Sequence, residues 1–139
     1  MVILYALANE RNLLVAGTGD RSESLLGYFT KYGDGGVDIL PIGHLYKTEV
    51  RALGSELKLP YAIVTKPSSP NLWPGHRAVE ELPADYDVLD RVLTLLYDSR
   101  KSLQQISSQT GISRSVIREV IKMNEQSKHK RELPPVPLN

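Results

Sequence analysis

The sequence predicts an α/β fold that is mostly helical, and three observations support this prediction. A short, continuous apolar run at residues 13–16 is typical of a strand buried on both faces. A glycine loop, Gly17–Asp20, follows this run and leads into a segment with helical spacing. Later in the chain, apolar residues at 89, 92, 93 and 96 recur at the spacing of one helix face.

Length and composition are those of an ordinary globular domain. The chain has 139 residues, of which 41% are hydrophobic and 24% charged. Its apolar runs are shorter than the roughly 18 residues of a membrane-spanning helix, so we expect no membrane protein. The first residues lack a basic leader, and we expect no signal peptide. With no cysteine, a disulfide framework and a cysteine nucleophile are excluded, and we expect a cytoplasmic protein.

The order of elements predicts a sheet that other residues complete. The expected helices cover residues 1–10, 22–29, 47–57, 89–96, 103–110 and 113–123. Residues 61–65 are an ambiguous second strand, and Ser102 with Gln105 matches a capping box. Nothing precedes Met1 to cap the first helix, and a lone buried strand leaves its backbone groups without partners. We therefore expect that residues outside this sequence supply further strands.

Charge divides the chain into two parts. Residues 1–87 carry 8 basic and 11 acidic side chains, and residues 88–139 carry 9 and 5, which gives net charges of −3 and +4. We expect the first part to hold the core and substrate loops, and the second to hold the C-terminal helices and basic tail of the same domain. The basic second part raises the question of an anionic ligand.

Three segments are candidates for binding a ligand. The N–H groups of Gly17–Asp20 suit an anion, although acidic residues such as Glu23 also simply favour a helix N-terminus. Residues 31–38 form a glycine-rich loop flanked by Lys31 and Asp38, which fits either a functional loop or a common surface ion pair. Lys47 opens a helix, where the helix dipole disfavours a cation, so either a role elsewhere or simple exposure explains it.

The C-terminal helices allow two interpretations. Residues 103–123 resemble a helix-turn-helix, with basic residues at 114, 118 and 122 on one face. Apolar residues at 116, 117, 120 and 121 are also what a packed helical hairpin needs, and no dense basic patch surrounds them, so nucleic-acid binding is the weaker interpretation. The cluster at residues 128–131 fits either a ligand site or a solvated tail.

Taken in order, these motifs resemble the NAD synthetase family, in its ammonia-dependent archaeal and bacterial form. The matching segments are residues 17–23, 26–38, 45–48, 66–73 and 129–131. The resemblance implies the adenine-nucleotide α-hydrolase-like fold of the ATP pyrophosphatases, which is Rossmann-like, and a homodimer. It also implies a ligase that uses ATP and Mg²⁺ to adenylate the nicotinate carboxylate of deamido-NAD, after which ammonia displaces AMP.

The resemblance also implies site residues. ATP would be bound by Thr18, Lys47 and Ser69, with Ser69 the least secure because Pro70 and Asn71 depart from the small residues expected there. Mg²⁺ would be held by Glu23. The remaining matches fall on positions that contact deamido-NAD: Lys31, Asp38, His129 and Lys130.

One departure from the family limits this prediction. The family's phosphate-gripping loop, Ser-Gly-Gly-x-x-Asp-Ser, is not found in the sequence, and neither is an arginine expected just before Met1. The chain therefore resembles the C-terminal half of the enzyme and would need an N-terminal half or a partner chain. We expect no NAD synthesis by this chain alone, and a non-catalytic nucleotide-binding fragment is the alternative.

Overall fold

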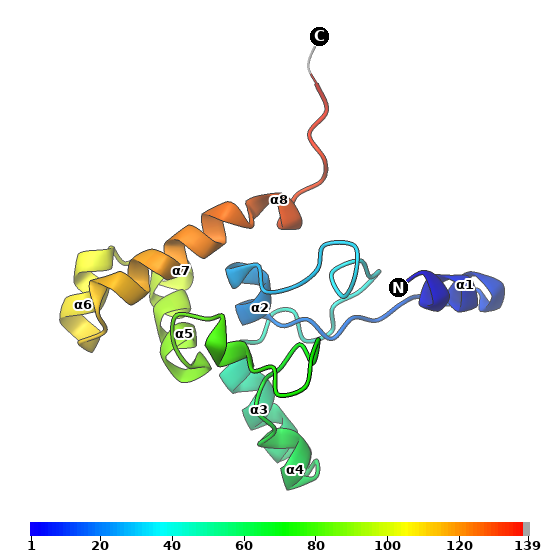
Figure 1. Ribbon diagram of the computed structural model, residues 1–139, viewed down its shortest axis with the longest axis horizontal. Coiled ribbons are helices and arrows are strands. Elements are labelled where there is room, and N and C mark those ends of the chain that lie inside the picture. Colours follow the sequence, from blue (N-terminus) through cyan, green and yellow to red (C-terminus); the bar gives the residue numbers. More distant parts are fainter. Residues whose placement is uncertain (138–139) are drawn as a thin grey trace.

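The computed structural model describes residues 1–137 and is mostly helical (Figure 1). Its α-helices are α1 (Val2–Arg11), α2 (Arg21–Leu26), α3 (Lys47–Glu56), α4 (Tyr61–Val64), α5 (Tyr86–Leu93), α6 (Leu103–Thr110), α7 (Arg114–Gln126) and α8 (Lys128–Arg131). A 3₁₀ turn, η1 (Ala78–Glu80), precedes α5, and a π-helix, η2 (Thr94–Asp98), continues it. The expected helices are therefore confirmed, with shifts of a few residues at their ends.

The core lies where α2, α3, α5, α6 and α7 meet. The residues at its centre are fully buried aliphatic side chains: Leu26, Leu89, Val92, Leu93, Ile106, Ile117 and Val120. Burying each stabilises the fold by roughly 1.5–3 kcal/mol. The core draws on both halves of the sequence, and it fixes α2 and α3 against α5.

Local signals explain where the helices begin and end. Asp20 caps α2 and forms a capping box with Glu23, and Ser102 does the same for α6 with Gln105, as expected. Helix α2 ends at Leu26, earlier than the expected residue 29, because Gly27 takes the left-handed conformation at φ 69°.

The expected strand at residues 13–16 is wrong as a complete element. Ala16 makes an isolated parallel bridge with Ile39, in which Ile39 O accepts a hydrogen bond from Gly17 N at 2.8 Å. Val15 is buried, but Leu13 and Leu14 are 61% and 69% exposed. The bridge pairs one edge of the segment at a single residue, so the segment stays extended without becoming a strand of a sheet.

The ambiguous segment at residues 61–65 is helical and not a strand. Pro60 O accepts hydrogen bonds from Ile63 N and Val64 N, which close the single turn of α4. Four consecutive apolar residues fit a buried strand and a short helix equally well, and the preceding proline favours the first turn of a helix.

Helix α1 lies at one end of the molecule, away from α5, α6 and α7 (Figure 1). Met1 is its N-cap and makes no side-chain capping bond, as expected. Val2 and Ile3 are 85% and 75% exposed. Within residues 1–137, no helix is both long enough and apolar enough to cross a membrane.

Candidate nucleotide-binding pocket

A pocket of about 900 Å³ lies between the loop that precedes α2, helix α3 and the segment at residues 66–72. It brings together five of the residues proposed from the sequence: Thr18, Glu23, Lys47, Ser69 and Lys130. Lys31, Asp38 and His129 do not line it. A volume of this size is within the range of small-molecule sites, which run to about 1,000 Å³.

Lys47 stands in this pocket between two carboxylates. Its Nζ lies 2.6 Å from Glu23 Oε1, to which it donates a hydrogen bond, and 2.6 Å from Asp20 Oδ2, with which it forms an ion pair. Burial alone would lower the pKa of Lys47, but the bonds and charges of Asp20 and Glu23 outweigh burial and raise it. These carboxylates offset the unfavourable helix dipole at the start of α3.

Glu23 takes part in the capping box of α2 and also lines the pocket. Its Oε2 accepts a hydrogen bond from Asp20 N at 3.2 Å in the capping box, and its Oε1 accepts from Lys47. Burial, followed by the negative charge of Asp20, raises the pKa of Glu23, against the opposing effect of Lys47. The capping interpretation is therefore confirmed, while metal binding by Glu23 stays a prediction.

The structure offers two carboxylates near Lys47 as possible ligands of a cation. Within residues 1–137, no group of three or more His, Cys, Asp or Glu side chains could hold a metal ion. Mg²⁺ is commonly bound by only one or two carboxylates together with substrate phosphates. Glu23, which lines the pocket, therefore fits Mg²⁺ that arrives with a nucleotide, whereas Asp20 is 1% exposed and does not line the pocket.

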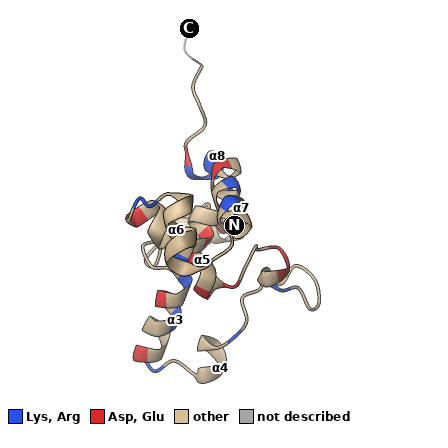
Figure 2. Cartoon of the chain, turned by 90° about the vertical axis from the view of Figure 1, so that its left-hand side faces the viewer, with Lys and Arg blue, Asp and Glu red and all other residues tan. Residues whose placement is uncertain are grey.

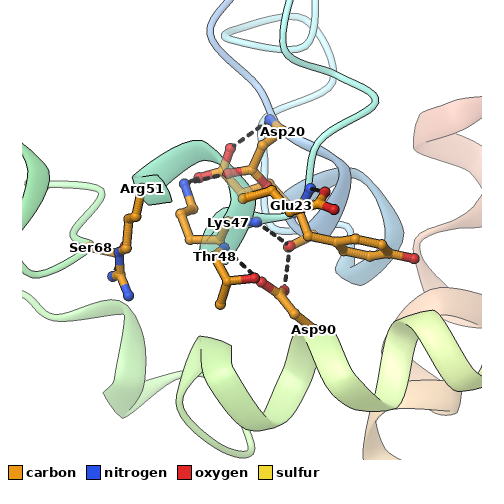
Figure 3. A network of polar contacts seen from close by, with 10 residues as sticks. Asp20, Glu23, Lys47, Thr48, Arg51, Ser68 and Asp90 are labelled. Carbon is orange, nitrogen blue, oxygen red and sulfur yellow. Dashed lines mark hydrogen bonds and ion pairs between the residues drawn. The ribbon is translucent and has the colours of Figure 1, made fainter. Parts of the chain in front are cut away.

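A buried polar network behind the pocket was not foreseen from the sequence (Figure 3). Asp90 Oδ1 accepts a hydrogen bond from Ser22 Oγ at 2.5 Å, and Asp90 Oδ2 accepts from Thr48 N at 2.8 Å. Ser22 Oγ in turn accepts from Lys47 N at 2.9 Å. Asp90 falls between the apolar positions 89 and 92 of α5, so the apolar periodicity does not identify it.

Two further pocket residues were also missed. The Tyr86 hydroxyl is buried and has no hydrogen-bond partner among the described residues, although the side chain lines the pocket. Burial, together with the charges of Glu23 and Asp20, raises the pKa of Tyr86, so its phenol stays neutral. Arg51 lies over the Tyr86 ring at 6.0 Å and donates to Ser68 Oγ at 3.3 Å. Neither residue belongs to a local sequence motif that could have identified it.

Hydrogen bonds from three cations join the α2–loop region to the C-terminal basic cluster, whose Lys and Arg positions colour α8 blue in Figure 2. Lys130 Nζ donates to Gly27 O at 2.8 Å and to Phe29 O at 2.7 Å. Lys31 Nζ donates to His129 O and to Glu132 O, and Arg131 Nη1 donates to Ser24 O at 2.9 Å. These three cations, which we name the carbonyl clasp, place the C-terminal segment beside the pocket.

Asp38 and Ser69 have local partners. Asp38 accepts from Val15 N at 2.7 Å and from the Tyr5 hydroxyl at 3.1 Å, so it does not form the surface pair with Lys31 that the sequence allowed. Ser69 Oγ donates to His76 O and accepts from Asn71 N at 3.0 Å. These hydrogen bonds give Asp38 and Ser69 each a structural role. Ligand binding by either residue stays a prediction.

Helices α6 and α7 form a tight hairpin through Gly111. Ile117 and Val120 are fully buried in the core, and Lys122 forms an ion pair with Glu119 at 3.1 Å on the outer face. The hairpin interpretation is confirmed by this packing. Nothing in it favours nucleic-acid binding.

The fold and the pocket together define part of an adenine-nucleotide α-hydrolase-like protein of the synthetase class. A family model described as NAD synthase matches residues 1–134, and the chain therefore belongs to the NAD synthase family.

Curated relatives and solved structures agree with this membership. An NH₃-dependent NAD⁺ synthetase from Staphylothermus marinus is 53% identical over 99% of the chain and 50% of its own length. Another from Saccharolobus solfataricus is 56% identical over 97% of the chain and 48% of its own length. The structure of NMN synthetase from Francisella tularensis aligns with a TM-score of 0.81 and 33% identity over 98% of this chain and 51% of its own. The chain thus spans about half the length of the relatives it matches.

Proposed function

We propose that this chain forms the part of an ammonia-dependent NAD synthetase that binds ATP and the nicotinate substrate. The observation that carries the proposal is the pocket, which gathers Thr18, Glu23 and Lys47 in a family whose curated members at this identity are NH₃-dependent NAD⁺ synthetases. The buried Tyr86 hydroxyl without a partner adds a polar group that a ligand would satisfy.

The chemistry of such an enzyme matches these residue types. A carboxylate is a poor electrophile, so the nicotinate carboxylate of deamido-NAD attacks the α-phosphate of ATP, and pyrophosphate leaves. Ammonia then attacks the acyl carbon of the acyl-adenylate, and AMP leaves as the amide forms. Lys47, which stays protonated at neutral pH, binds the departing phosphates, where positive charge stabilises the transition state.

Glu23, with Asp20 beside it, holds Mg²⁺ in this proposal. The chemistry that Mg²⁺ supplies when bound is neutralisation of charge on the phosphates. Lys47 Nζ lies 2.6 Å from both carboxylates, so the lysine that binds the phosphates in this proposal stands next to the proposed Mg²⁺ ligand. In this proposal Lys31, Asp38, His129 and Lys130 bind deamido-NAD, and Lys130 is the one of the four that lines the pocket.

Completion of the site needs a phosphate loop from residues outside this sequence. The backbone of the extended segment 13–16 supports this requirement, because residues 15 and 17 bond to the segment around Ile39 while Leu13 and Leu14 expose their side chains. A homodimer and a cytoplasmic location also belong to this proposal.

Reconstitution tests the proposal directly. The chain is co-expressed with the half of the Staphylothermus marinus relative that it does not match, and NAD formation from ATP, deamido-NAD and ammonia is measured. We expect turnover by the complex, none by either half alone, and loss of turnover in Lys47→Ala. A complex that forms on gel filtration but makes no NAD would contradict the proposal. Because the Francisella tularensis relative is an NMN synthetase, nicotinate mononucleotide is tested as a second substrate.

A further inference from the structure

Asp90 is a buried carboxylate that the proposed reaction does not use. It is 4% exposed, lies on α5 beside fully buried aliphatic side chains, and does not line the candidate nucleotide pocket. A buried carboxylate is costly unless hydrogen bonds satisfy it. Asp90 meets this condition through two donors that belong to two other helices, Ser22 on α2 and the Thr48 amide on α3.

These two bonds converge on the start of α3. The first N–H groups of a helix have no partner inside the helix. In α3, the Lys47 amide donates to Ser22 Oγ and the Thr48 amide donates to Asp90, so both groups are satisfied by one relay. A negative charge at this end also interacts favourably with the helix dipole.

The same relay reaches both charged residues of the pocket. Ser22 directly precedes Glu23 on α2, and Lys47 is the first residue of α3 (Figure 3). Ser22, itself fully buried, holds the backbone of Lys47, while Asp90 fixes the hydroxyl of Ser22. One side chain on α5 is therefore bonded both to the residue before Glu23 on α2 and to the start of α3, where Lys47 lies.

We propose that Asp90 is a positioning residue that, through Ser22 and the Thr48 amide, holds Glu23 and Lys47 in contact for phosphate binding. The importance of that contact for catalysis rests on the proposed function, but the positioning itself does not. Asparagine does not reproduce Asp90, because its side chain has one oxygen and one NH₂ group where the relay uses two carboxylate oxygens as acceptors. In Asp90→Asn, either the Ser22 hydroxyl or the Thr48 amide loses its acceptor.

A zero-length carbodiimide cross-link measures the contact in the full chain without any nucleotide. The reagent joins an amine to a carboxylate only when they touch, and Lys47 Nζ lies 2.6 Å from Glu23 Oε1. We expect a mass-spectrometric cross-link between Lys47 and Glu23 or Asp20 in the wild type. In Asp90→Asn its yield falls, by as much as the roughly 100-fold that a displacement near 1 Å can cost a proximity-dependent reaction. The matched control Asp87→Asn, an exposed position on the same helix, keeps the wild-type yield.

A second pair of variants covers the case in which Asp90→Asn does not fold. Ser22→Ala removes the other half of the relay and should also lose the cross-link, while Ser24→Ala on the same helix keeps it. Folded variants of Asp90 and Ser22 with the wild-type yield would overturn the inference. Unfolding of both would also overturn it, because Asp90 would then serve stability alone.

Amide hydrogen exchange of the wild type gives an independent measurement. The amides of Lys47 and Thr48 should exchange as slowly as those in the interior of α3, because both donate to buried acceptors. Exchange as fast as that of an unpartnered helix start would overturn the inference. Neither measurement involves ATP or NAD, so a failure of NAD synthesis would refute the proposed function and leave the positioning role standing.

Discussion

Lys47 takes part in several kinds of interaction. Its ammonium contacts two carboxylates and lies 5.4 Å from the centre of the Tyr86 ring, while its backbone amide is held by Ser22. A lysine at the first position of a helix is ordinarily unfavourable because of the dipole. The surrounding charges make it the most tightly held side chain of the pocket, which is a property that its sequence position alone would not suggest.

Replacing Lys47 by methionine should destabilise the chain in a pH-dependent way. At neutral pH, Asp20 and Glu23 lose their cation, and we expect a loss of about 2 kcal/mol, below the value for a fully buried pair. The raised pKa of Lys47 means that its contribution is present below the ordinary value of 10.5 and lost as pH rises through the folded-state pKa. Without Lys47 the pKa of Glu23, already raised by burial, rises further, so the loss shrinks as Glu23 becomes protonated in acid.

Urea unfolding of the wild type and Lys47→Met from pH 3 to 11 measures this difference. The control is Lys128→Met, because Lys128 is an exposed residue paired with Glu132 at 3.5 Å, and we expect a change within about 0.5 kcal/mol. A stability difference that does not vary with pH would show that Lys47 contributes only by packing.

At the scale of elements, two glycines end helices in the same way but in different surroundings. Gly27 ends α2 at φ 69°, and Gly111 ends α6 at φ 73°. A side chain at Gly27 would place its Cβ 2.0 Å from Ser127 Cβ, whereas nothing lies within 4 Å of one at Gly111. The end of α2 is therefore packed against the end of α7, and the end of α6 is open.

Alanine at the two positions should separate backbone strain from close packing. Gly111→Ala should cost about 1–2 kcal/mol from the left-handed conformation alone. Gly27→Ala should cost clearly more, because Ser127 or α7 must also move. Denaturant unfolding measures both, and equal losses would contradict the close approach of α2 and α7.

The sequence was most informative where a signal lies within a few residues. The capping box of Ser102 and Gln105 and the apolar spacing of α5 correctly placed helices, because both act over one or two turns. The segment at residues 61–65 stayed ambiguous because four apolar residues in a row match neither the helical nor the strand period specifically. Asp90 was missed for a different reason: its partners are 68 and 42 residues away, and only the packing of three helices brings them together.

At the scale of the whole molecule, large apolar side chains are exposed on a surface at the N-terminal end, as others are around α3 and α4. The residues of this surface with large exposed side chains are Val2, Ile3, Leu4, Leu7, Leu13 and Leu14. Contiguous exposed apolar surface marks an interaction site or an aggregation hazard. Thr18, Glu23 and Lys47 follow this surface in the chain. The segment at residues 13–17 connects the surface to the pocket.

Lysine at Leu14 should reduce self-association of the isolated chain without lowering its stability. Leu14 is 69% exposed, so the substitution removes little buried area and adds charge to the apolar surface. Sedimentation velocity across a concentration series checks the association, and urea unfolding checks the stability. Leu89→Ala, at a fully buried position, is the contrast and should cost about 2–5 kcal/mol. Unchanged association in Leu14→Lys would mean that this surface is not what joins the chains.

The carbonyl clasp gives the junction between the α2–loop region and the C-terminal segment a resistance to acid. Lys31, Lys130 and Arg131 direct their charges at main-chain oxygens, which have no proton to gain as the medium is acidified. The contacts of Lys47 depend instead on carboxylates that do. Acidification would therefore loosen the centre of the pocket while the segment beside it stayed attached, and the two regions would come apart in a fixed order.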